Sequence, residues 1–363
     1  MEYGKNISRI YKLFNMKLKI GNKLLSKNNK AYIIAEIGVN HNGKLSIAKK
    51  LIDHAVSAGA NCVKFQTFNA NNVATKNTKL AIYQKKNKVK EKNQFDMLKK
   101  LELSKNDFKN LFRYCKKKKI DFLSTPVNKE DVDFLDKIGV KGFKMASMHA
   151  SEPDFIKYVV SKNKPIFAST GMCNIDEVKE MVKILKRSKN KNICLMQCTS
   201  NYPSKIEDSN INVLKRYNKF GFLLGYSDHT QSDVSAIVAL AFGARVFEKH
   251  FTLNKKMAGP DHIASLNPNE LKQYINNLRL AEQSFGSEIK KILNSELNTK
   301  LIGRRSLSVS KRILKGEKIT SDKIKFMRPG TGIKVKDLKL VLNKKVKKDL
   351  NVNEFLSWKH ILK

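Results

Sequence analysis

Short apolar runs alternate with longer helical patterns along most of the chain, and this alternation occurs eight times. The runs are rich in Val, Ile and Phe, which is typical of buried strands. The segments between them carry apolar residues at helical spacing, for example Ile47, Leu51 and Ala55. Strands that alternate with helices indicate a parallel sheet, and eight such units predict a (β/α)8 barrel. The expected strands span residues 31–38, 62–68, 120–127, 142–147, 165–170, 192–198, 221–228 and 245–251.

A doubly wound open sheet is the alternative for the same alternation. When such a sheet binds a dinucleotide, a glycine-rich phosphate loop follows its first strand. Residues 39–43 read Val-Asn-His-Asn-Gly and lack the spacing of that loop. The barrel is therefore the favoured architecture.

A polar stretch after the last expected helix of the barrel indicates a linker before a final small domain. We expect a disordered leader at residues 1–17, the barrel at 18–286, a linker at 287–302 and a small β-rich domain at 303–363. Within the barrel, the Lys- and Asn-rich insertion at 69–94 predicts a surface loop or lid. Because a domain of about 60 residues buries little apolar surface alone, the last one should pack against a barrel, its own or a partner's.

The formal charge of +40 raises nucleic acid or an anionic membrane as partners. However, only ten of the 72 basic residues are arginine, the side chain best suited to bidentate recognition of phosphates and bases. The lysines are scattered through every segment of the chain. We therefore expect a solvated lysine-rich surface and a small anionic substrate, with no nucleic-acid or membrane partner.

The five cysteines are an odd number without CxxC spacing, which favours reduced thiols and a cytoplasmic location. No stretch approaches the roughly 18 apolar residues that span a bilayer. The N-terminus also lacks the apolar core of a signal peptide. These features predict a soluble cytoplasmic protein.

Polar side chains gather at the carboxyl ends of the expected strands, where barrel enzymes place their reacting groups. Two of them, His229 and His250, end consecutive strands. Either one alone is commonly a hydrogen-bonded structural histidine. Together they suit a divalent metal that keeps positions open for substrate and water. Glu248 shares a face with His250 by the period-two rule, so Lys249 should point the other way.

Lys64 and Lys144 interrupt otherwise apolar strands, and an ammonium buried without an anion costs several kcal/mol. A bound phosphate or carboxylate would satisfy them, and so would a salt bridge to a neighbouring glutamate such as Glu36. The cluster of Ser169 and Thr170 offers hydroxyl donors to an oxyanion, or forms an ordinary turn and helix cap.

These groups together describe a pocket for a small phosphorylated or carboxylated molecule beside an electrophile polarised by a metal. Carbon–carbon bond formation to an aldehyde fits such a pocket. A lyase or an isomerase fits it as well, and composition alone does not choose among them.

The same strand-end motifs resemble those of the sialic acid (N-acetylneuraminate) synthase family, from about residue 18 to the C-terminus. The motifs are AEIGVNHNG at 35–43, VKFQT at 63–67, STP at 124–126, FKMAS at 143–147, STGM at 169–172, QCTSNYP at 197–203, GYSDH at 225–229, EKHFT at 248–252, GPDH at 259–262 and MRPGTG at 327–332.

The resemblance implies a (β/α)8 TIM barrel followed by an antifreeze-like (SAF) domain, which is swapped onto the partner's active site in a homodimer. It implies a transferase that condenses phosphoenolpyruvate with an N-acylated amino-sugar aldehyde, giving a nine-carbon 2-keto acid and phosphate. Mn²⁺ is the expected metal, with Mg²⁺ or Co²⁺ as alternatives. It would bind to His229 and His250, hold the open-chain sugar and polarise its aldehyde.

The resemblance also implies roles for individual residues. Glu36 would help to orient a metal-bound water or the substrate, and it joins Lys64, Lys144, His229 and His250 as the catalytic set. The residues expected to hold phosphoenolpyruvate are Lys64, Thr125, Lys144, Ser147, Ser169, Thr170 and Ser227. Those expected to contact the sugar are Asn40, Gln66, His149, Tyr202, Asp261 and, from the partner's tail, Arg328.

One departure from the family pattern concerns the sugar. Many members follow the Lys-x-x-Ser motif with Gly and an acidic residue, where this chain has Met148 and His149. An imidazole in place of a carboxylate changes both charge and hydrogen bonding. The acceptor therefore stays open between N-acetylmannosamine, its 6-phosphate, and a diacetamido dideoxy sugar that leads to legionaminic or pseudaminic acid.

Two interpretations from other classes differ in what they predict. A nucleic-acid-binding protein would bind DNA or RNA with a steep salt dependence. A tail domain that binds carbohydrate or ice, attached to an inert barrel, would leave the strand-end motifs without a role.

Overall fold

The computed structural model describes residues 16–87 and 89–362 and divides into two compact units, with the division between Phe285 and Gly286. The expected leader at 1–17 lies outside the described residues except for Met16 and Lys17. Met16 is buried and Lys17 begins a strand, so the ordered chain starts slightly before residue 18.

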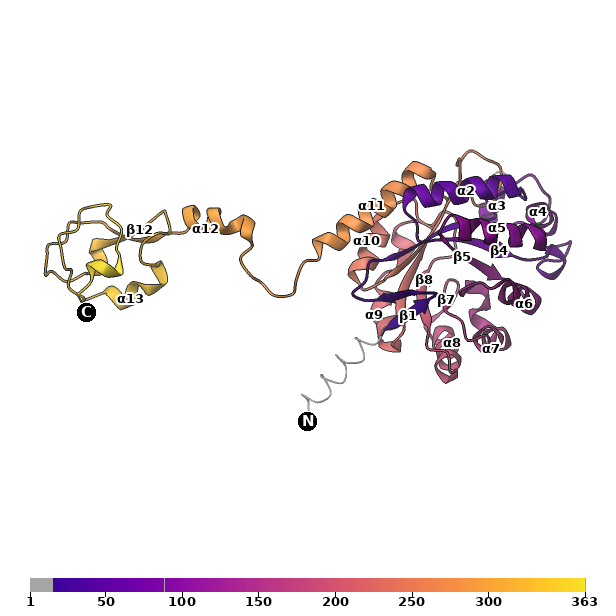
Figure 1. The fold of residues 1–363 in the computed structure, drawn as a ribbon, viewed down its shortest axis with the longest axis horizontal. Coiled ribbons are helices and arrows are strands. Elements are labelled where there is room, and N and C mark those ends of the chain that lie inside the picture. The colour runs from indigo at the N-terminus through magenta and orange to yellow at the C-terminus, as the bar shows by residue number, and fades with distance from the viewer. Residues whose placement is uncertain (1–15, 88, 363) are drawn as a thin grey trace. The chain divides into compact units, whose positions relative to one another are not determined.

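The first unit is a ring of eight parallel strands, which confirms the predicted (β/α)8 fold. Hydrogen bonding follows the order β5-β4-β3-β10-β9-β8-β7-β6, and β5 and β6 lie next to each other where the ring closes. Figure 1 shows the strands inside a layer of helices. The strands are β3 (Tyr32–Gly38), β4 (Cys62–Thr67), β5 (Asp121–Pro126), β6 (Phe143–Met145), β7 (Ile166–Ser169), β8 (Ile193–Cys198), β9 (Leu223–Asp228) and β10 (Val246–His250).

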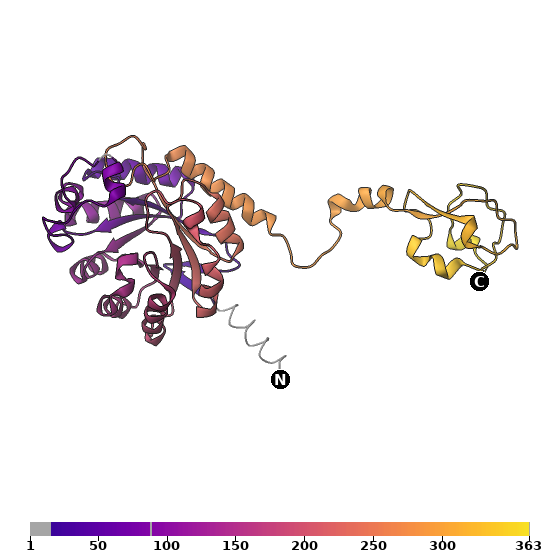
Figure 2. The same ribbon diagram turned by 180° about the vertical axis from the view of Figure 1, so that it is seen from behind.

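The helices that cover the ring are amphipathic and begin at local signals in the sequence. Helix α8 is an example: the Asn174 side chain accepts hydrogen bonds from the first turn, Glu177 closes a capping box, and an apolar face that includes Val178 and Leu185 is buried. Figure 2 shows the same covering layer from behind. The covering helices are α2 (Leu45–Ala58), α5 (Lys105–Lys117), α6 (Lys129–Ile138), α7 (Pro153–Ser161), α8 (Ile175–Arg187), α9 (Val213–Tyr217), α10 (Val234–Ala241) and α11 (Pro268–Ser284).

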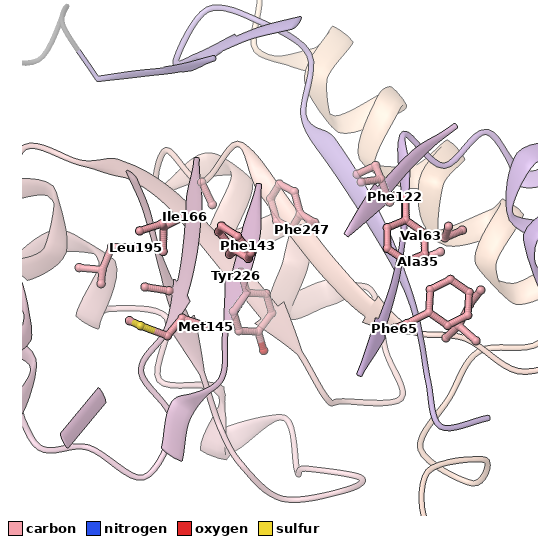
Figure 3. Close-up of a cluster of buried hydrophobic side chains, with 14 of the residues drawn as sticks. Ala35, Val63, Phe65, Phe122, Phe143, Met145, Ile166, Leu195, Tyr226 and Phe247 are labelled. Atoms are coloured by element: carbon pink, nitrogen blue, oxygen red, sulfur yellow. The ribbon is translucent and has the colours of Figure 1, made fainter. Parts of the chain in front are cut away.

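Alternation along each strand separates two environments. The outward positions are apolar and pack against the helices, and ten of the side chains in this cluster are labelled in Figure 3. The inward positions change from apolar to charged along β3 and β4. On β3, Ile34 and then Glu36 point into the ring, and on β4, Cys62 and then Lys64 do so. The apolar half lies toward the start of the strands and the polar half toward their ends.

A hairpin that the sequence analysis did not predict closes the amino-terminal mouth of the barrel. Strands β1 (Lys17–Ile20) and β2 (Lys23–Ser26) pair antiparallel. Leu18 and Ile20 are fully buried against the inward apolar residues. The two strands hold only four residues each and alternate with lysine, so their apolar signal is short.

The insertion at 69–94 is only partly the surface loop that we expected. It contains a 3₁₀ turn (Ala70–Asn72) and α3 (Ile82–Lys86), and α4 (Gln94–Leu101) follows from its last residue. Gln84 and Asn87 are buried, and Asn87 Nδ2 donates to the Pro260 carbonyl at 2.6 Å. A tertiary contact thus orders a segment whose composition indicated a solvated loop.

The second unit has its own small apolar core. β11 (Ser306–Val309) and β12 (Ile324–Met327) pair antiparallel, and the core includes Leu307, Ile319 and Leu356. The segment expected to be a plain linker contains α12 (Leu297–Gly303), and α13 (Leu338–Val341) lies farther along the chain. No helix in the described ranges is both long and apolar enough to cross a membrane.

Candidate active site

A cavity of about 420 Å³ opens at the carboxyl ends of the barrel strands. Side chains from all eight strands or the loops that follow them line it, as expected for a barrel enzyme. The predicted site residues that the structure brings together here are Glu36, Lys64, Gln66, Thr125, Lys144, Ser147, Ser169, Tyr202, Ser227, His229 and His250.

Four buried side chains of alternating charge form the floor of this cavity. Lys64 Nζ lies 2.9 Å from Glu36 Oε1 and 3.8 Å from Glu248 Oε1. Lys144 Nζ lies 3.7 Å from the same Glu248 oxygen. Both lysines therefore have glutamate partners, as the salt-bridge alternative anticipated. The second carboxylate oxygens of Glu36 and Glu248 are buried without a hydrogen-bond partner, so the network leaves acceptors open.

Burial and charge move the pKa values of these groups in different directions. Burial raises the pKa of Glu36 to about 7, because Lys64 offsets only part of the desolvation. Burial lowers the pKa of Lys144, because it disfavours the charged ammonium. Burial also acts to lower the pKa of Lys64, but Glu248 and Glu36 hold it above its usual value. Glu36 and Lys144 are thus the pair shifted toward neutrality, which is typical of groups that exchange protons in a reaction.

Three hydroxyl groups around the lysines are oriented by donors behind them. Lys64 Nζ donates to Thr125 Oγ1 at 2.9 Å, and Lys144 Nζ donates to Ser169 Oγ at 2.6 Å. The backbone N–H of Gly171 donates to Ser147 Oγ at 2.9 Å. A hydroxyl that accepts one hydrogen bond keeps its own hydrogen to donate. The cavity therefore presents directed O–H donors beside two ammonium groups, which suits an anion.

The two histidines stand together at the ends of β9 and β10. Their ring centroids are 5.2 Å apart, and the Tyr202 ring lies 4.2 Å from His229. His229 Nδ1 lies 2.6 Å from the Thr199 carbonyl, which only accepts, so Nδ1 carries the hydrogen and Nε2 keeps its lone pair. His250 Nδ1 is buried without a hydrogen-bond partner, and Asp261 Oδ2 lies 3.9 Å from it.

This donor set fits a divalent metal that uses few protein ligands. Among residues 16–87 and 89–362, no group of three or more His, Cys, Asp or Glu side chains is placed to hold an ion. The pair of imidazoles would therefore be the protein's main contribution. A histidine whose other nitrogen is fixed by a carbonyl is the usual arrangement of a metal ligand. The orphaned carboxylate oxygens of Glu36 and Glu248 add acceptor capacity in the same cavity.

Four predicted site residues of the first unit do not line the cavity. Asn40 is buried and donates to the Phe251 carbonyl and to Ser265 Oγ. Thr170 donates to the Met196 carbonyl. Asn40 and Thr170 thus help to hold the strand ends in place. Asp261 lies next to His250. His149 is the fourth.

The prediction that His149 faces the sugar is not what the structure shows. Its ring is 1% exposed, stacks on Phe155 at 4.0 Å and bonds Glu152 through Nδ1 at 2.8 Å. Residues 147–151 form a 3₁₀ turn, so the alternation of the preceding strand no longer decides which side chain points inward. Met148 lines the cavity instead.

Arg328 lies in the second unit, immediately after β12, and its side chain is exposed. Because it belongs to the other compact unit, its expected contact with the sugar stays a prediction.

Several lining residues were missed as site residues by the sequence analysis. Glu248 is the main one, and the period-two relation to His250 was the available signal. Lys249 points the other way as predicted, and pairs with Asp228 at 2.8 Å. Tyr83 and Gln84 come from the insertion, where nothing in the local pattern marked them. Cys198 lies 3.9 Å from His229 Nδ1, and although burial acts to raise its pKa, His229 holds it at about 7.

Comparison with known proteins places the geometry in context. Residues 51–290 match the NeuB family and residues 304–362 match the SAF domain. The N,N'-diacetyllegionaminic acid synthase of Campylobacter jejuni is 40% identical over 90% of this chain and 99% of its own length. The pseudaminic acid synthase of the same species is 32% identical over 93% and 98%. The crystal structure of N-acetylneuraminic acid synthetase from Leptospira borgpetersenii in complex with citrate superposes with a TM-score of 0.70, at 29% identity over 78% of this chain and 94% of that one.

Proposed function

Because the chain belongs to the NeuB family and is a synthase of the sialic, legionaminic and pseudaminic acid type, we propose that it condenses phosphoenolpyruvate with an N-acylated amino-sugar aldehyde. The methylene carbon of phosphoenolpyruvate bonds to the aldehyde carbon, one water is consumed, and inorganic phosphate leaves. The product is a nine-carbon 2-keto acid. The observation that supports this proposal most directly is the network of Glu36, Lys64, Glu248 and Lys144, which shares one cavity with the two histidines.

The phosphoenolpyruvate site is the part of the cavity around Lys64 and Lys144. The substrate has a phosphate and a carboxylate, and two ammonium groups with directed hydroxyls match that pair of anions. Both lysines already hold carboxylates, so no net positive charge has to stay buried alone before binding. The donors expected to take the substrate are Lys64, Lys144, Thr125, Ser147 and Ser169. Ser227 instead donates to Glu248 Oε1 at 3.1 Å and helps to fix that carboxylate.

Glu36 is the candidate group for proton transfer during the reaction. Glu36 has its pKa raised to about 7 by burial, so it can both hold and release a proton near neutral pH. Gln66 Nε2 donates to Glu36 Oε1 at 3.3 Å and keeps that oxygen in place. We assign to Glu36 the orientation and deprotonation of the attacking water.

His229 and His250 would hold a divalent ion, with Mn²⁺ the first choice and Mg²⁺ or Co²⁺ as alternatives. When bound, such an ion would polarise the aldehyde of the open-chain sugar. The chain's own contribution is to fix the His229 tautomer through Thr199 and to enclose the two rings beneath Tyr202. The remaining surface of the histidine pair stays available to the sugar.

For the sugar, we favour a diacetamido deoxyhexose over N-acetylmannosamine. Met148 faces the cavity, and a thioether cannot accept a strong hydrogen bond from a sugar hydroxyl. Phe68, Val73, Leu98 and Val127 line the same cavity and favour a less hydroxylated acceptor. The higher identity to the legionaminic acid synthase than to the pseudaminic acid synthase points the same way.

We also propose that the enzyme is a cytoplasmic homodimer in which Arg328 of the partner subunit reaches the sugar's N-acyl group. The domain division that goes with this is a barrel at 18–286, a linker at 287–302 and a SAF domain at 303–363. The linker segment carries a series of exposed apolar side chains that a partner would cover: Ile289, Ile292, Leu293, Leu297, Leu301 and Ile302. Five unpaired cysteines agree with a reducing compartment.

The test is a substrate panel assayed by phosphate release, with mass spectrometry of the keto-acid product. Phosphoenolpyruvate would be combined with N-acetylmannosamine, its 6-phosphate and diacetamido deoxyhexoses, each with and without Mn²⁺. We expect fastest turnover with a diacetamido sugar, and none without metal. Absence of turnover with every sugar in the metal-loaded protein would refute the proposed reaction.

A further inference from the structure

A second cavity of about 620 Å³ lies beside the catalytic one, between the loops that follow β7 and β8. Met172, Cys198 and Ser200 line both cavities, so the two share a wall. Cys173 lines only the second. The proposed reaction gives this side cavity no role.

Two of the five cysteines differ from the rest in their surroundings. Cys62, Cys115 and Cys194 are buried among the apolar side chains of strands and helices. Cys173 is only half-buried, and both it and Cys198 face the side cavity. Small molecules that enter this cavity can therefore reach two thiols, whereas the other three are enclosed.

Both of these sulfur atoms lie against Gly171. Cys173 Sγ is 3.4 Å from the Gly171 carbonyl oxygen, and Cys198 Sγ is 3.3 Å from the position that a β-carbon on Gly171 would occupy. The hydroxyl oxygens of Ser200 and Ser147 lie nearer to that position than Cys198 Sγ does, so these two serine side chains have to shift when the sulfurs approach each other.

Strand register supports the same closeness. β7 pairs with β8 so that Ser169 lies opposite Met196, and continuing the register places Gly171 opposite Cys198. Paired strands are about 4.8 Å apart. Cys173 lies two residues beyond Gly171, and a disulfide needs Cα atoms about 4.4–6.8 Å apart. The proposed disulfide therefore requires the loop at 171–173 to move Cys173 toward Cys198.

This loop is also suited to a second conformation. Met172 has a φ of 62°, in the left-handed region that a non-glycine residue adopts at a cost, and its side chain is 71% exposed. A rearrangement of the loop would relieve this conformation without uncovering a packed side chain. Movement of the loop would also withdraw the Gly171 N–H from Ser147 Oγ, one of the oriented donors of the anion site.

We propose that Cys173 and Cys198 form a peroxide-sensitive thiol pair that switches the enzyme off. Hydrogen peroxide oxidises one thiol to a sulfenic acid and releases water. The second sulfur attacks it, the S–O bond breaks, and a second water leaves as the S–S bond forms. The two sulfurs together lose two electrons, which the peroxide accepts, and both thiol hydrogens leave in water.

The effect on activity follows from what Cys198 touches. Its sulfur lies 3.8 Å from Ser147 Oγ and 3.9 Å from His229 Nδ1. Drawing it toward Cys173 disturbs one anion donor and one of the two histidines. A thiol reductant would restore both, so the loss should be reversible.

The experiment uses the full-length protein treated with hydrogen peroxide and then with dithiothreitol. Tryptic peptides are mapped by mass spectrometry, and activity is followed by phosphate release. We expect a disulfide between the peptides 163–179 and 192–205, with fragmentation placing it at Cys198 rather than Cys194. Two thiols should be lost per chain, and dithiothreitol should recover them together with the activity.

Cys173→Ser supplies the decisive comparison, and Cys115→Ser is the matched control from the enclosed cysteines. Cys173→Ser should keep its basal activity and resist reversible inactivation about tenfold better than the wild type, whereas Cys115→Ser should behave as the wild type. Equal sensitivity of Cys173→Ser, or an oxidised protein without the 173–198 cross-link, would overturn the proposal. The activity part rests on the proposed function, but the peptide map needs no turnover, so the two can fail separately.

Discussion

The two mouths of the barrel are built from the same strands and have opposite chemistry. At the amino-terminal mouth, a hairpin buries Leu18 and Ile20 against Tyr32 and Ile34. At the carboxyl-terminal mouth, two residues beyond Ile34 on the same strand face, Glu36 enters a buried network of charges. Apolar closure contributes stability at one end, while at the other the costly burial of charge is retained for binding and chemistry.

Salt bridges at the two mouths show the same contrast. Near the hairpin, Asp121 is paired with Lys23 and Lys141, whose side chains are about half exposed, and it accepts from Tyr32 Oη. At the catalytic mouth, Lys64, Lys144 and Glu248 are at most 5% exposed. Exposed lysines can be lost at little cost, whereas the buried ones have no water to replace a missing partner.

The largest effect that separates the mouths is expected from Lys144→Met. Phosphoenolpyruvate would lose one charge-assisted donor, and we expect kcat/KM to fall about 10²–10³-fold. The free energy of unfolding should change by less than about 1 kcal/mol, because an ammonium that burial disfavours is removed while Glu248 keeps Lys64 as its cation. Phosphate-release kinetics and urea denaturation measure the two quantities. A parallel loss of activity and stability would contradict the separation.

The converse change is Ile20→Ala in the hairpin. Ile20 is fully buried, and its truncation should lower the free energy of unfolding by about 2–4 kcal/mol. The kcat/KM of the folded protein should stay within about twofold of the wild type, because the cavity lies at the other end of the strands. Leu24→Ala is the matched control: Leu24 is 49% exposed on the same hairpin and should cost little. A tenfold fall in kcat/KM for Ile20→Ala would show that the mouths are coupled.

Acid should affect the catalytic mouth first. His41 and His262 lie in loops after β3 and β10, and burial lowers the pKa of each to about 4. The unfolded chain takes up these protons near pH 6.5, so stability is unaffected above that pH and falls as the pH drops from 6.5 to 4.

Asp121 near the hairpin follows a different pH window. Burial acts to raise its pKa, but Lys23 and Lys141 hold it below the usual 3.8. Its contribution to stability is complete above pH 3.8 and is lost as the pH falls through the lowered value. Hydrogen exchange between pH 6.5 and 4 should show loss of protection after β3 and β10 before the hairpin. Simultaneous loss at both mouths would contradict this order.

The smallest effect is expected from Lys23→Ala. Asp121 keeps Lys141 and Tyr32 as partners, so the change should cost about 0.5 kcal/mol of unfolding free energy. The double change of Lys23 and Lys141 to Ala should cost more than the sum of the single changes, because it leaves a buried carboxylate without a cation. A double-mutant cycle from urea denaturation measures the difference. Strictly additive losses of unfolding free energy would show that Lys23 and Lys141 are not coupled through Asp121.

The sequence predicted the barrel well because its strands are buried on both faces and read as continuous apolar runs. It failed where contacts between distant segments decide the structure. The β1–β2 hairpin has four-residue strands interrupted by lysine, and α3 is ordered by contacts such as that of Asn87 with Pro260. Neither the hairpin nor the contact that orders α3 can be recognised from the local sequence.

The site was predictable for as long as strand alternation held. Glu36, Lys64 and His250 are inward positions on regular strands and reach the cavity. His149 was expected at the sugar only from the resemblance; it lies beyond the end of β6 in a 3₁₀ turn, where strand alternation no longer applies, and Met148 lines the cavity instead. Residues such as Tyr83 enter the cavity from an insertion, and only the folded chain shows where that insertion lies.

The metal-dependent condensation is tested most directly by phosphate release from phosphoenolpyruvate and a diacetamido deoxyhexose by metal-free protein titrated with Mn²⁺. We expect no release before the metal is added, release that saturates near one ion per chain, and none at any Mn²⁺ concentration for the double variant His229→Ala, His250→Ala. Full release by the metal-free wild type, or by the double variant, would contradict it.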